Sequence, residues 1–437
     1  MAVALYNGFP LVEGDTGSYI ASGIEQSVPP DRTPFYGLFV RITSMWASLW
    51  LPIIAQCLLL TFVLRRFIRS FFTEALPSNI LLLIVLLITS FTCVSWIAAF
   101  LMPDVFAGIL LLSILLYLPN KKKNSFSGIV YLLIITLCII IHNSHFLITA
   151  AFASLILVYA LFTRNKILIL RNTAMIAISV SFFFLVHFIN DNNGNGFAFS
   201  KNSYQFMITK FAETGILKNY LDDNCDKKHF AICSFRNEIP PVSWEFLWSD
   251  YSPPYRAGGW EAHRAEYEYI IHDVFNTAKY RNLFIQKSFI YSLRQLVTFN
   301  VPDVCTFHGP DSQPYRYIKL YFEDEIGAYI SAKQNNGGFH GETCNIFYYV
   351  YFALSVAMLL FLFPRLMTTE VKFTYACVLI FLLVNAFVSA TFSTVINRFQ
   401  SRVFWVLPAL NTILIVKYLY YQYSAKLESP DTQKEIR

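Results

Sequence analysis

Residues 79–101 read NILLLIVLLITSFTCVSWIAAFL, an apolar run without a charged side chain. About 20 apolar residues are enough for a helix to cross the hydrocarbon core of a bilayer. Comparable runs recur along the chain, and the predicted spans are 46–64, 79–101, 105–119, 126–141, 146–163, 172–190, 346–364, 373–394 and 402–421. The sequence therefore predicts an all-α polytopic membrane protein with nine or ten transmembrane helices.

The composition of the 437-residue chain agrees with this prediction. Hydrophobic residues make up 55% of the chain and charged residues only 14%. A soluble globular chain carries roughly 25% charged residues. The shortage of polar surface argues strongly against a soluble enzyme.

The charges also indicate the orientation of the spans. Lys and Arg concentrate in short cytoplasmic loops, and here they mark every second loop, at Arg65–Arg69, Lys121–Lys123, Arg164–Lys166 and Arg365–Lys372. These loops are expected to face the cytoplasm. The chain is then an integral protein of a membrane, with the bacterial inner (plasma) membrane as the expected one, and its largest polar segment is periplasmic or extracellular.

Four regions follow from this topology. They are an N-terminal transmembrane region, 1–190, with a first outer loop at 12–45, an extracytoplasmic and mostly helical domain, 191–345, a C-terminal transmembrane region, 346–421, and a disordered cytoplasmic tail, 422–437. Residues 1–12 are apolar but too short to span. They fit either the end of a first transmembrane helix whose start is missing, which would make ten spans, or a short interfacial segment.

The cysteines support the outside location of 191–345. Cys225, Cys233, Cys305 and Cys344 all fall in this segment, whereas the other four lie inside predicted spans. Disulfides persist outside the cytosol, so two bonds are expected in this domain. Proximity in sequence favours Cys225 with Cys233 and Cys305 with Cys344, but the other pairings and four unpaired thiols remain open.

The polar groups that are candidates for chemistry collect at the predicted outer ends of the spans. They are Asp15 in the first outer loop, Asp104 in a tight turn, His142 and His145 in the next outer turn, and Arg398 and Arg402 before the last span. Ionisable residues at mid-span depth, by contrast, are almost absent, which disfavours an ion-coupled carrier.

Each of these residues has a chemical and a structural interpretation. Asp104, His142 and His145 would suit a divalent metal ion, and arginines suit a phosphate. Alternatively, Asp15 caps a helix over 16–25, Asp104 caps the span that begins at Val105, and the histidines and arginines are ordinary interfacial residues.

The sequence Glu13-Gly-Asp15-Thr-Gly-Ser-Tyr19 is followed by Asp31-Arg32-Thr-Pro34-Phe-Tyr36, which leads into a span. This part resembles the first outer loop of the GT-C membrane glycosyltransferases, such as the protein mannosyltransferases and the lipid A aminoarabinose transferases. Those families have an acid followed by a Tyr after the first helix, then an Arg-Pro-Pro-x-Tyr-like motif. Asp104 matches a second-loop acid by position, and Arg398-Phe399 with Pro408 is loosely similar to a pattern near their last spans.

The resemblance implies that Asp15 is the catalytic base or a metal ligand. Arg32 and Tyr36 of the resembling loop are expected to bind the substrate, and Arg398 and Arg402 are expected to bind its phosphate because arginine suits that group. Two features depart from the family pattern, because Asp15 follows Gly14 instead of forming an Asp-Glu pair, and because a large domain is inserted at 191–345. The substrate is therefore not carried over.

The function that these observations favour is a membrane glycosyltransferase. It would move a sugar from a polyprenyl-phosphate donor to an envelope glycan, lipid or protein acceptor on the extracytoplasmic side. A non-enzymatic flippase or assembly component for envelope polysaccharide is the alternative. The expected partners are the lipid-linked sugar and membrane lipids, with no nucleic acid and with a divalent metal as a possible cofactor, while the oligomeric state stays open. Trp244, Trp248 and Trp260 in the outer domain would either stack on sugar rings or pack its core.

Overall fold

The structure is a computed structural model that describes residues 1–72, 75–119, 126–301, 308–339 and 341–427. Regular structure in these ranges is helical, and one isolated β-bridge joins Leu11 to Phe100. The helices, with 3-10 turns marked η, are α1 (Ala2–Asn7), α2 (Gly14–Glu25), α3 (Phe35–Ser44), α4 (Trp50–Ser70), α5 (Ser78–Phe91), α6 (Val94–Ile97), α7 (Val105–Tyr117), α8 (Phe126–Ile141), α9 (Asn143–Phe162), α10 (Lys166–Asn192), α11 (Ser203–Glu213), α12 (Ile216–Asn224), η1 (Ala231–Phe235), α13 (Ser243–Trp248), α14 (Pro253–Arg256), α15 (Arg264–Asn276), α16 (Ala278–Val297), α17 (Gln313–Tyr321), η2 (Glu323–Glu325), α18 (Ile326–Ser331), η3 (Lys333–Asn336), α19 (Gly341–Leu366), α20 (Thr369–Phe392), α21 (Asn397–Phe404) and α22 (Val406–Leu427).

Six helical stretches are long and apolar enough to cross a membrane. They are α4, α9, α10, α19, α20 and the consecutive pair α21–α22. Three more apolar helices are shorter, since α5, α7 and α8 have 14, 13 and 16 residues. The prediction of an all-helical integral membrane protein is confirmed at this level.

The predicted span 79–101 is wrong as a single helix. Helix α5 ends at Phe91, and Thr92 has an extended backbone. The Thr92 hydroxyl donates to the Ile88 carbonyl, and the Ser95 hydroxyl donates to the Thr89 carbonyl. The Ser95 hydroxyl thus occupies a carbonyl that the Cys93 amide would bond in a continuing helix, and the chain turns here despite its apolar character.

Two more boundaries differ from the sequence prediction. The predicted span 402–421 begins inside the separate helix α21, which ends at Phe404, and α22 starts only at Val406. Helix α22 continues to Leu427, so 422–427 are helical and not part of a disordered tail. The rest of the predicted tail, 428–437, lies outside the described residues.

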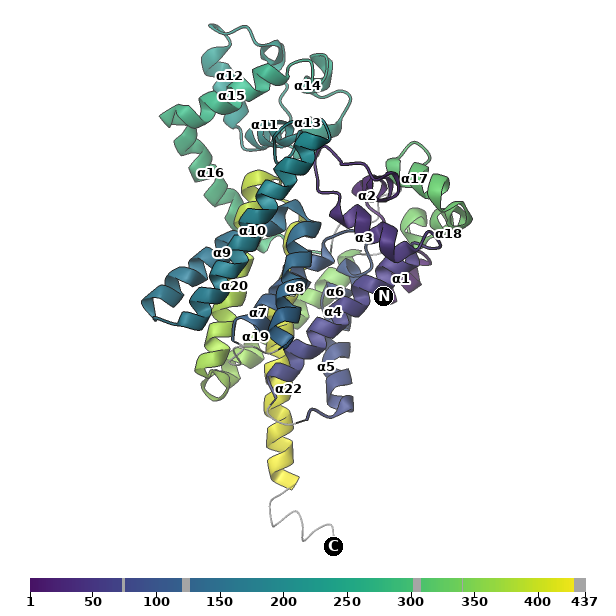
Figure 1. Cartoon of the computed structure of the whole chain (residues 1–437), viewed down its shortest axis with the longest axis vertical. Coiled ribbons are helices and arrows are strands. Elements are labelled where there is room, and N and C mark those ends of the chain that lie inside the picture. Colours follow the sequence, from purple (N-terminus) through teal and green to yellow (C-terminus); the bar gives the residue numbers. More distant parts are fainter. Residues whose placement is uncertain (73–74, 120–125, 302–307, 340, 428–437) are drawn as a thin grey trace.

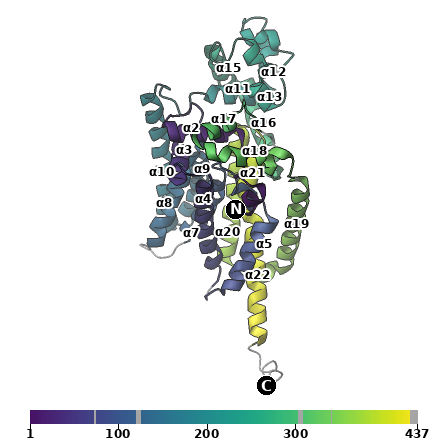
Figure 2. The ribbon, with the colours of Figure 1, turned by 90° about the vertical axis from the view of Figure 1, so that its right-hand side faces the viewer.

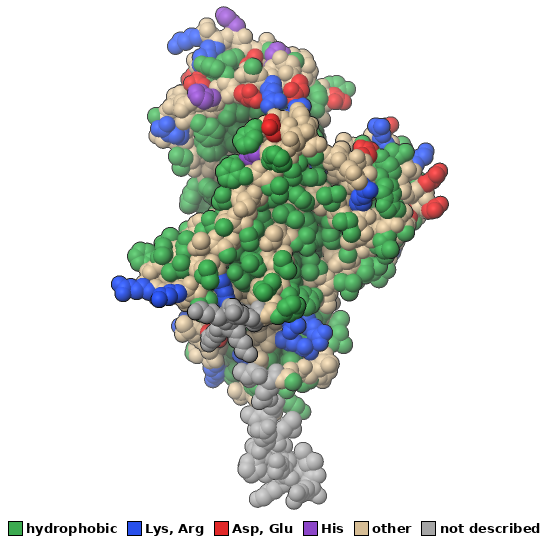
Figure 3. Space-filling model, viewed as in Figure 1, with side chains coloured by type: hydrophobic (Ala, Val, Ile, Leu, Met, Phe, Trp, Pro, Cys, Tyr) green, Lys and Arg blue, Asp and Glu red, His purple; other side chains and the backbone are tan. Residues whose placement is uncertain are grey.

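Several connections between consecutive spanning helices lie at the same end of the structure. The C-terminal end of α4 and the turns joining α9 to α10 and α19 to α20 lie on the side away from α11–α15 (Figure 1). These turns contain or adjoin predicted cytoplasmic basic clusters, while Lys121–Lys123 lie outside the described residues. In Figure 3 a broad hydrophobic surface covers the helices below α11–α15, and Lys and Arg side chains gather at its lower edge.

The polar segment 191–345 divides into two parts with different surroundings. Helices α11–α15 enclose a hydrophobic core of their own, which includes Phe211, Tyr220 and Tyr267. The Cys225–Cys233 disulfide lies in this part and is confirmed. Cys344 has no disulfide partner among the residues that the structure describes, and Cys305 lies outside them, so the second bond stays a prediction.

The second part, α17 to η3, packs on the N-terminal loops instead. Figure 2 shows α17 and α18 beside α2 and α3, at the level of the upper ends of the spanning helices. The Gln334 side chain bonds both the amide and the carbonyl of Val12. Glu325 accepts from the Ser48 hydroxyl and the Leu49 amide. This part therefore completes the wall around the first outer loop.

Helix α16 connects the two parts. Its lower half packs along α20. The apolar face that the sequence indicates remains exposed, with Ile285, Phe289 and Leu293 each at least half accessible. Among the described residues, the hydrophobic core of the α11–α15 part does not cover this face of α16.

Candidate functional site

The first outer loop begins with a segment pinned to the turn before α7. The Leu11 amide donates to the Ala99 carbonyl, and the Leu101 amide donates to the Leu11 carbonyl, each at 2.9 Å. The buried Gln56 amide donates to the carbonyls of Ala98 and Phe100. These bonds occupy the backbone groups of two non-helical segments, and they place the start of the first outer loop beside the Asp104 turn.

Asp15 is not the cap of α2. The N-cap residue is Glu13, whose amide donates to the Thr16 hydroxyl at 3.0 Å, and α2 starts at Gly14. The Asp15 carboxylate faces two guanidinium groups, 3.0 Å from Arg32 Nη2 and 3.4 Å from Arg398 Nη2. The capping interpretation of Asp15 is therefore wrong.

Arg32 is held by the same loop and by the turn between α8 and α9. Its guanidinium also pairs with Asp31 and lies 4.9 Å over the Tyr19 ring. The Asn143 side chain donates to the Asp31 carbonyl, and the Thr33 hydroxyl donates to the Ile140 carbonyl. The first outer loop is thus attached to the histidine-containing turn.

Helix α21 carries two arginines one turn apart on the same face. Arg398 reaches Glu13 at 4.0 Å and Asp15 at 3.4 Å. Arg402 is fully buried. It donates to the side-chain amide oxygen of Asn385 at 3.0 Å and to the Ser144 hydroxyl at 3.2 Å. Because four residues separate them, both side chains point into one region.

The segment before α21 is fixed by the outer domain. Glu213 accepts from the Thr394 hydroxyl, and Gln295 exchanges two hydrogen bonds with the backbone of Ile396. None of these residues touches the carboxylates described above, yet they set where α21 begins. Glu213 and Gln295 were not singled out from the sequence, because no local pattern marks a side chain that holds a distant loop.

Asp104 lies under both arginines of α21. Its side chain makes no cap bond to α7, which corrects the capping interpretation. One carboxylate oxygen is 3.9 Å from Arg398 Nε and the other is 3.8 Å from Arg402 Nη1. Arg398 therefore contacts both Asp15 and Asp104, and the structure brings together the acids of two loops and the arginines of a third segment.

Several buried polar atoms of this cluster have no hydrogen-bond partner among the described residues. On the arginines they are Arg32 Nη1, Arg398 Nε, Arg402 Nε and Arg402 Nη1. The carboxylate of Asp104 is near enough for charge attraction but too far for a hydrogen bond. Buried donors without acceptors are costly, so these N–H groups fit a site that receives anionic oxygen atoms.

Charges around Asp15 alter its proton affinity and that of its neighbours. Burial by itself raises the pKa of Asp15, but Arg32 and Arg398 outweigh it, and the pKa lies below its usual value. Burial raises the pKa of Glu13, with only partial compensation by Arg398. Asp15 therefore keeps its negative charge to lower pH than Glu13 does.

His142 and His145 lie next to the arginines of α21, where the His142 ring lies 4.9 Å from the His145 ring. His142 Nδ1 accepts from the Ser144 amide, and His145 Nδ1 bonds the Cys138 carbonyl at 2.7 Å. Within the described ranges, no three His, Cys, Asp or Glu side chains are grouped as metal ligands. A metal role for Asp104, His142 and His145 stays a prediction.

Two further residues, Tyr36 and His308, pack next to the residues of this cluster. Tyr36 is fully buried, its ring packs on Tyr19, and its hydroxyl donates to Gln56 at 3.4 Å. The Tyr36 ring thus packs against Tyr19, whose own ring lies against the Arg32 guanidinium. His308 lies close to Gly14 and Asp15, and burial lowers its pKa against the opposing charge of Asp15. His308 was missed because it lies almost 300 positions further along the chain.

Asp15 and Arg32 line a cavity of about 580 Å³ that opens to the outside. The wall comes from α2, the loop after it, α13 and α17. Asp15 keeps 37% of its side-chain surface accessible although it has two arginine partners. The carboxylate thus stands between the arginine cluster and the cavity.

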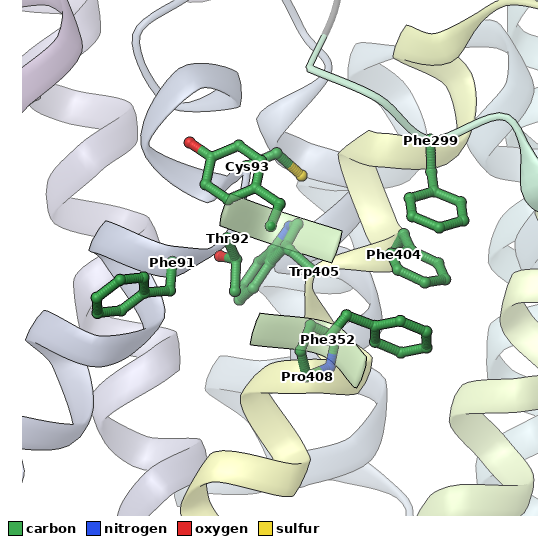
Figure 4. A pocket seen from close by; sticks show the side chains of 9 residues that line it. Phe91, Thr92, Cys93, Phe299, Phe352, Phe404, Trp405 and Pro408 are labelled. Carbon is green, nitrogen blue, oxygen red and sulfur yellow. The ribbon is translucent and has the colours of Figure 1, made fainter. Parts of the chain in front are cut away.

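A second cavity lies on the other side of α21 and is very small. Figure 4 shows its aromatic lining, with Phe299, Phe352, Phe404 and Trp405 around a space of about 20 Å³. That volume holds about one water molecule. The outward cavity, by contrast, has room for a substrate.

No family model, curated protein or solved structure matches this chain.

Proposed function

We propose that the protein is a membrane glycosyltransferase that moves a sugar from a polyprenyl-phosphate donor to an acceptor on the extracytoplasmic side. One observation carries this proposal: the Asp15 carboxylate lies between an outward cavity of substrate size and buried arginine N–H groups that find no acceptor in the described part of the chain. This is the placement required of a base that acts between a phosphate-bearing donor and an acceptor.

The arginines would bind the phosphate of the donor. Phosphate oxygens supply the acceptors that Arg398 Nε and Arg402 Nη1 lack, and arginine binds phosphate through its planar, permanently charged fork. Asn385 and Ser144 keep Arg402 in place. The lipid tail of the donor would extend among the spanning helices.

Asp15 would act as the general base. The acceptor hydroxyl oxygen attacks the anomeric carbon, its proton passes to Asp15, and the bond from the anomeric carbon to the phosphate oxygen breaks. The phosphate leaves with the electron pair, and the arginines stabilise its charge. One direct displacement inverts the configuration at the anomeric carbon.

The ion pairs of Asp15 give a reason for ordered binding. In the free protein Arg32 and Arg398 keep the pKa of Asp15 low, which makes it a weak base. A phosphate that draws these guanidinium groups toward itself would reduce their effect on Asp15, and its own negative charge would raise the pKa further. The base would then gain strength when the donor is in place.

The proposal includes the finer topology. The three short apolar helices α5, α7 and α8 would complete nine crossings with the six long ones. The basic loops would be cytoplasmic, and α11–α18 would be periplasmic or extracellular in a bacterial inner membrane. A reporter that is active only outside, fused after Asn345, should then be active, and the same reporter fused after Lys123 should be silent.

Transfer of label from a polyprenyl-phosphate sugar tests the function. The purified protein in vesicles is given the labelled donor with an envelope extract as the source of acceptor. We expect label on a water-soluble or lipid acceptor together with free polyprenyl phosphate. The Asp15→Asn variant should lose this transfer. Its control is Asp250→Asn, which changes an exposed acid of the outer domain and should keep full activity.

The flippase alternative gives a different result in the same vesicles. Donor added to one leaflet would become accessible from the other without release of polyprenyl phosphate. That outcome, with no labelled acceptor for any extract fraction, would contradict the glycosyltransferase proposal.

A further inference from the structure

The outward cavity next to Asp15 has a shape suited to a small polar molecule. Its volume of about 580 Å³ lies within the range of sites that enclose a drug-sized ligand. In Figure 3 the surface is indented between the α11–α15 part and the α17–α18 part, and residues of α13 and α17 line the cavity from these two sides.

Two aromatic side chains line this cavity from opposite parts of the chain. Trp248 is the last residue of α13, and Tyr317 belongs to α17. Trp248 is 56% exposed, whereas Trp260 of the same domain is 6% exposed and packs in the core. An accessible indole at a cavity wall offers a flat apolar face to the C–H surface of a sugar ring.

The rest of the lining is dense in hydrogen-bonding groups. Hydroxyls and amides come from Ser18, Ser27, Asn202 and Gln313. Hydroxyl and amide groups both donate and accept, which is what recognition of several sugar hydroxyls requires. Ala21, Val28, Pro29 and Pro30 supply the aliphatic part of the lining.

The charges of the lining are mainly negative. Asp15, Asp31 and Glu25 face a single cation, Arg32, which already pairs with both aspartates. Glu25 accepts a hydrogen bond from the Tyr321 hydroxyl at 2.6 Å. An acidic molecule would be repelled here, because like charges in a partly desolvated cavity are unfavourable.

We infer that this cavity binds the acceptor and that the acceptor is a short carbohydrate without acidic groups. The inference rests on the proposed function, because it assigns the acceptor hydroxyl to the space beside Asp15. Trp248 and Tyr317 orient the sugar rings by stacking, and Glu25 excludes acidic sugars.

Direct binding tests this without any need for turnover. A panel of neutral glucose, galactose, mannose and N-acetylglucosamine disaccharides is measured against the full-length protein in nanodiscs by saturation-transfer NMR. We expect at least one to bind, and Trp248→Ala to weaken it roughly five- to tenfold. Trp244→Ala is the matched control, because Trp244 is 63% exposed on the same helix and does not line the cavity.

A charged probe sharpens the result. The best disaccharide is compared with its counterpart that carries one uronic acid ring. We expect weaker binding of the uronic acid form and partial recovery in Glu25→Gln. The inference is overturned if no neutral disaccharide binds, if Trp244→Ala has the same effect as Trp248→Ala, or if a Ser/Thr-rich peptide binds in a Trp248-dependent way while the sugars do not.

These results separate the inference from the proposed function. Trp248-dependent sugar binding without any transfer would leave the sugar site standing and would contradict the transferase. Transfer to an acceptor whose affinity is the same in Trp248→Ala would support the transferase. It would overturn the assignment of the cavity to the acceptor.

Discussion

The two parts of the polar segment 191–345 are neighbours in sequence but differ in what they pack against. Helices α11–α15 enclose their own core and contain the Cys225–Cys233 disulfide. The part from α17 to η3 has no separate core of its own among the described residues, and its buried side chains belong to the core of the membrane-embedded half. One part is therefore a domain in its own right, and the other is a component of the candidate site.

This difference predicts how far the structural effect of a mutation will extend. A change in the contact between α17 and the first outer loop should move Asp15, whereas a change inside α11–α15 should stay local. Contacts between α11–α15 and the site pass through few residues, such as Glu213 at Thr394 and Trp248 at the cavity.

The largest effect is expected from Gly17→Ala. A Cβ at Gly17 would lie 2.4 Å from the Gln313 carbonyl carbon, a backbone atom that cannot rotate away. We expect a loss of about 3 kcal/mol of stability, at the upper end for overpacking, together with loss of transfer. Thermal unfolding in detergent measures it. Gly14→Ala is the control on the same helix, because its nearest neighbour is the His308 ring at 3.7 Å; equal effects of the two variants would contradict the close α2–α17 contact.

Removal of the disulfide should destabilise only the other part. The paired replacement Cys225→Ser with Cys233→Ser opens a short loop, with a sequence separation of 8. The expected cost is about 2–3 kcal/mol through the unfolded state. Hydrogen exchange should show faster opening of α11–α15, while transfer at low temperature stays near the original rate. Uniformly faster exchange that includes α2 and α17 would show that the two parts are not separate.

Glu325→Gln should have a smaller effect on the α17-to-η3 part. The Glu325 carboxylate accepts from the Ser48 hydroxyl and, at 3.0 Å, from the Leu49 amide. Weakening two hydrogen bonds to a charged acceptor should cost about 1–2 kcal/mol. Glu323→Gln, which changes an exposed acid two residues earlier, should leave the melting temperature unchanged. A similar melting temperature for both variants would mean that Glu325 does not hold this part in place.

The smallest expected change concerns pH. Asp15 acts in its charged form, and that form is lost only as pH falls through a pKa that Arg32 and Arg398 hold below its usual value. The acid side of the kcat/KM profile should therefore show no loss from Asp15 near neutral pH. In Arg32→Gln the pKa of Asp15 should rise, so the acid limb should move to higher pH. An unchanged limb would show that Asp15 is not the titrating base.

The sequence alone predicted a helical membrane protein and one of its disulfides correctly. Spans and cysteine positions follow from local composition, which the bilayer and the redox compartment dictate. The break after Phe91 was missed because the residues on both sides are equally apolar. It depends on where the Thr92 and Ser95 hydroxyls bond, which composition does not reveal.

The candidate site was only partly visible in the sequence. Asp15, Asp104, Arg398 and Arg402 were selected because they share one predicted membrane depth, and the structure connects them through ion pairs. His308, Glu213 and Gln295 approach from the outer segment. Their positions depend on how α11–α18 pack on the membrane helices, which no spacing within the sequence specifies.

The most direct test of the account measures donor binding and transfer together in Asp15→Asn. The account predicts that this variant binds the labelled polyprenyl-phosphate sugar at least as well as the unchanged protein, because the arginines remain and one negative charge is removed. It also predicts that the bound donor stays intact, with transfer reduced by at least roughly 10²-fold, as expected for loss of a general base. Transfer at the original rate with Asn at position 15 would contradict the central claim that Asp15 links the donor phosphate site to the acceptor cavity.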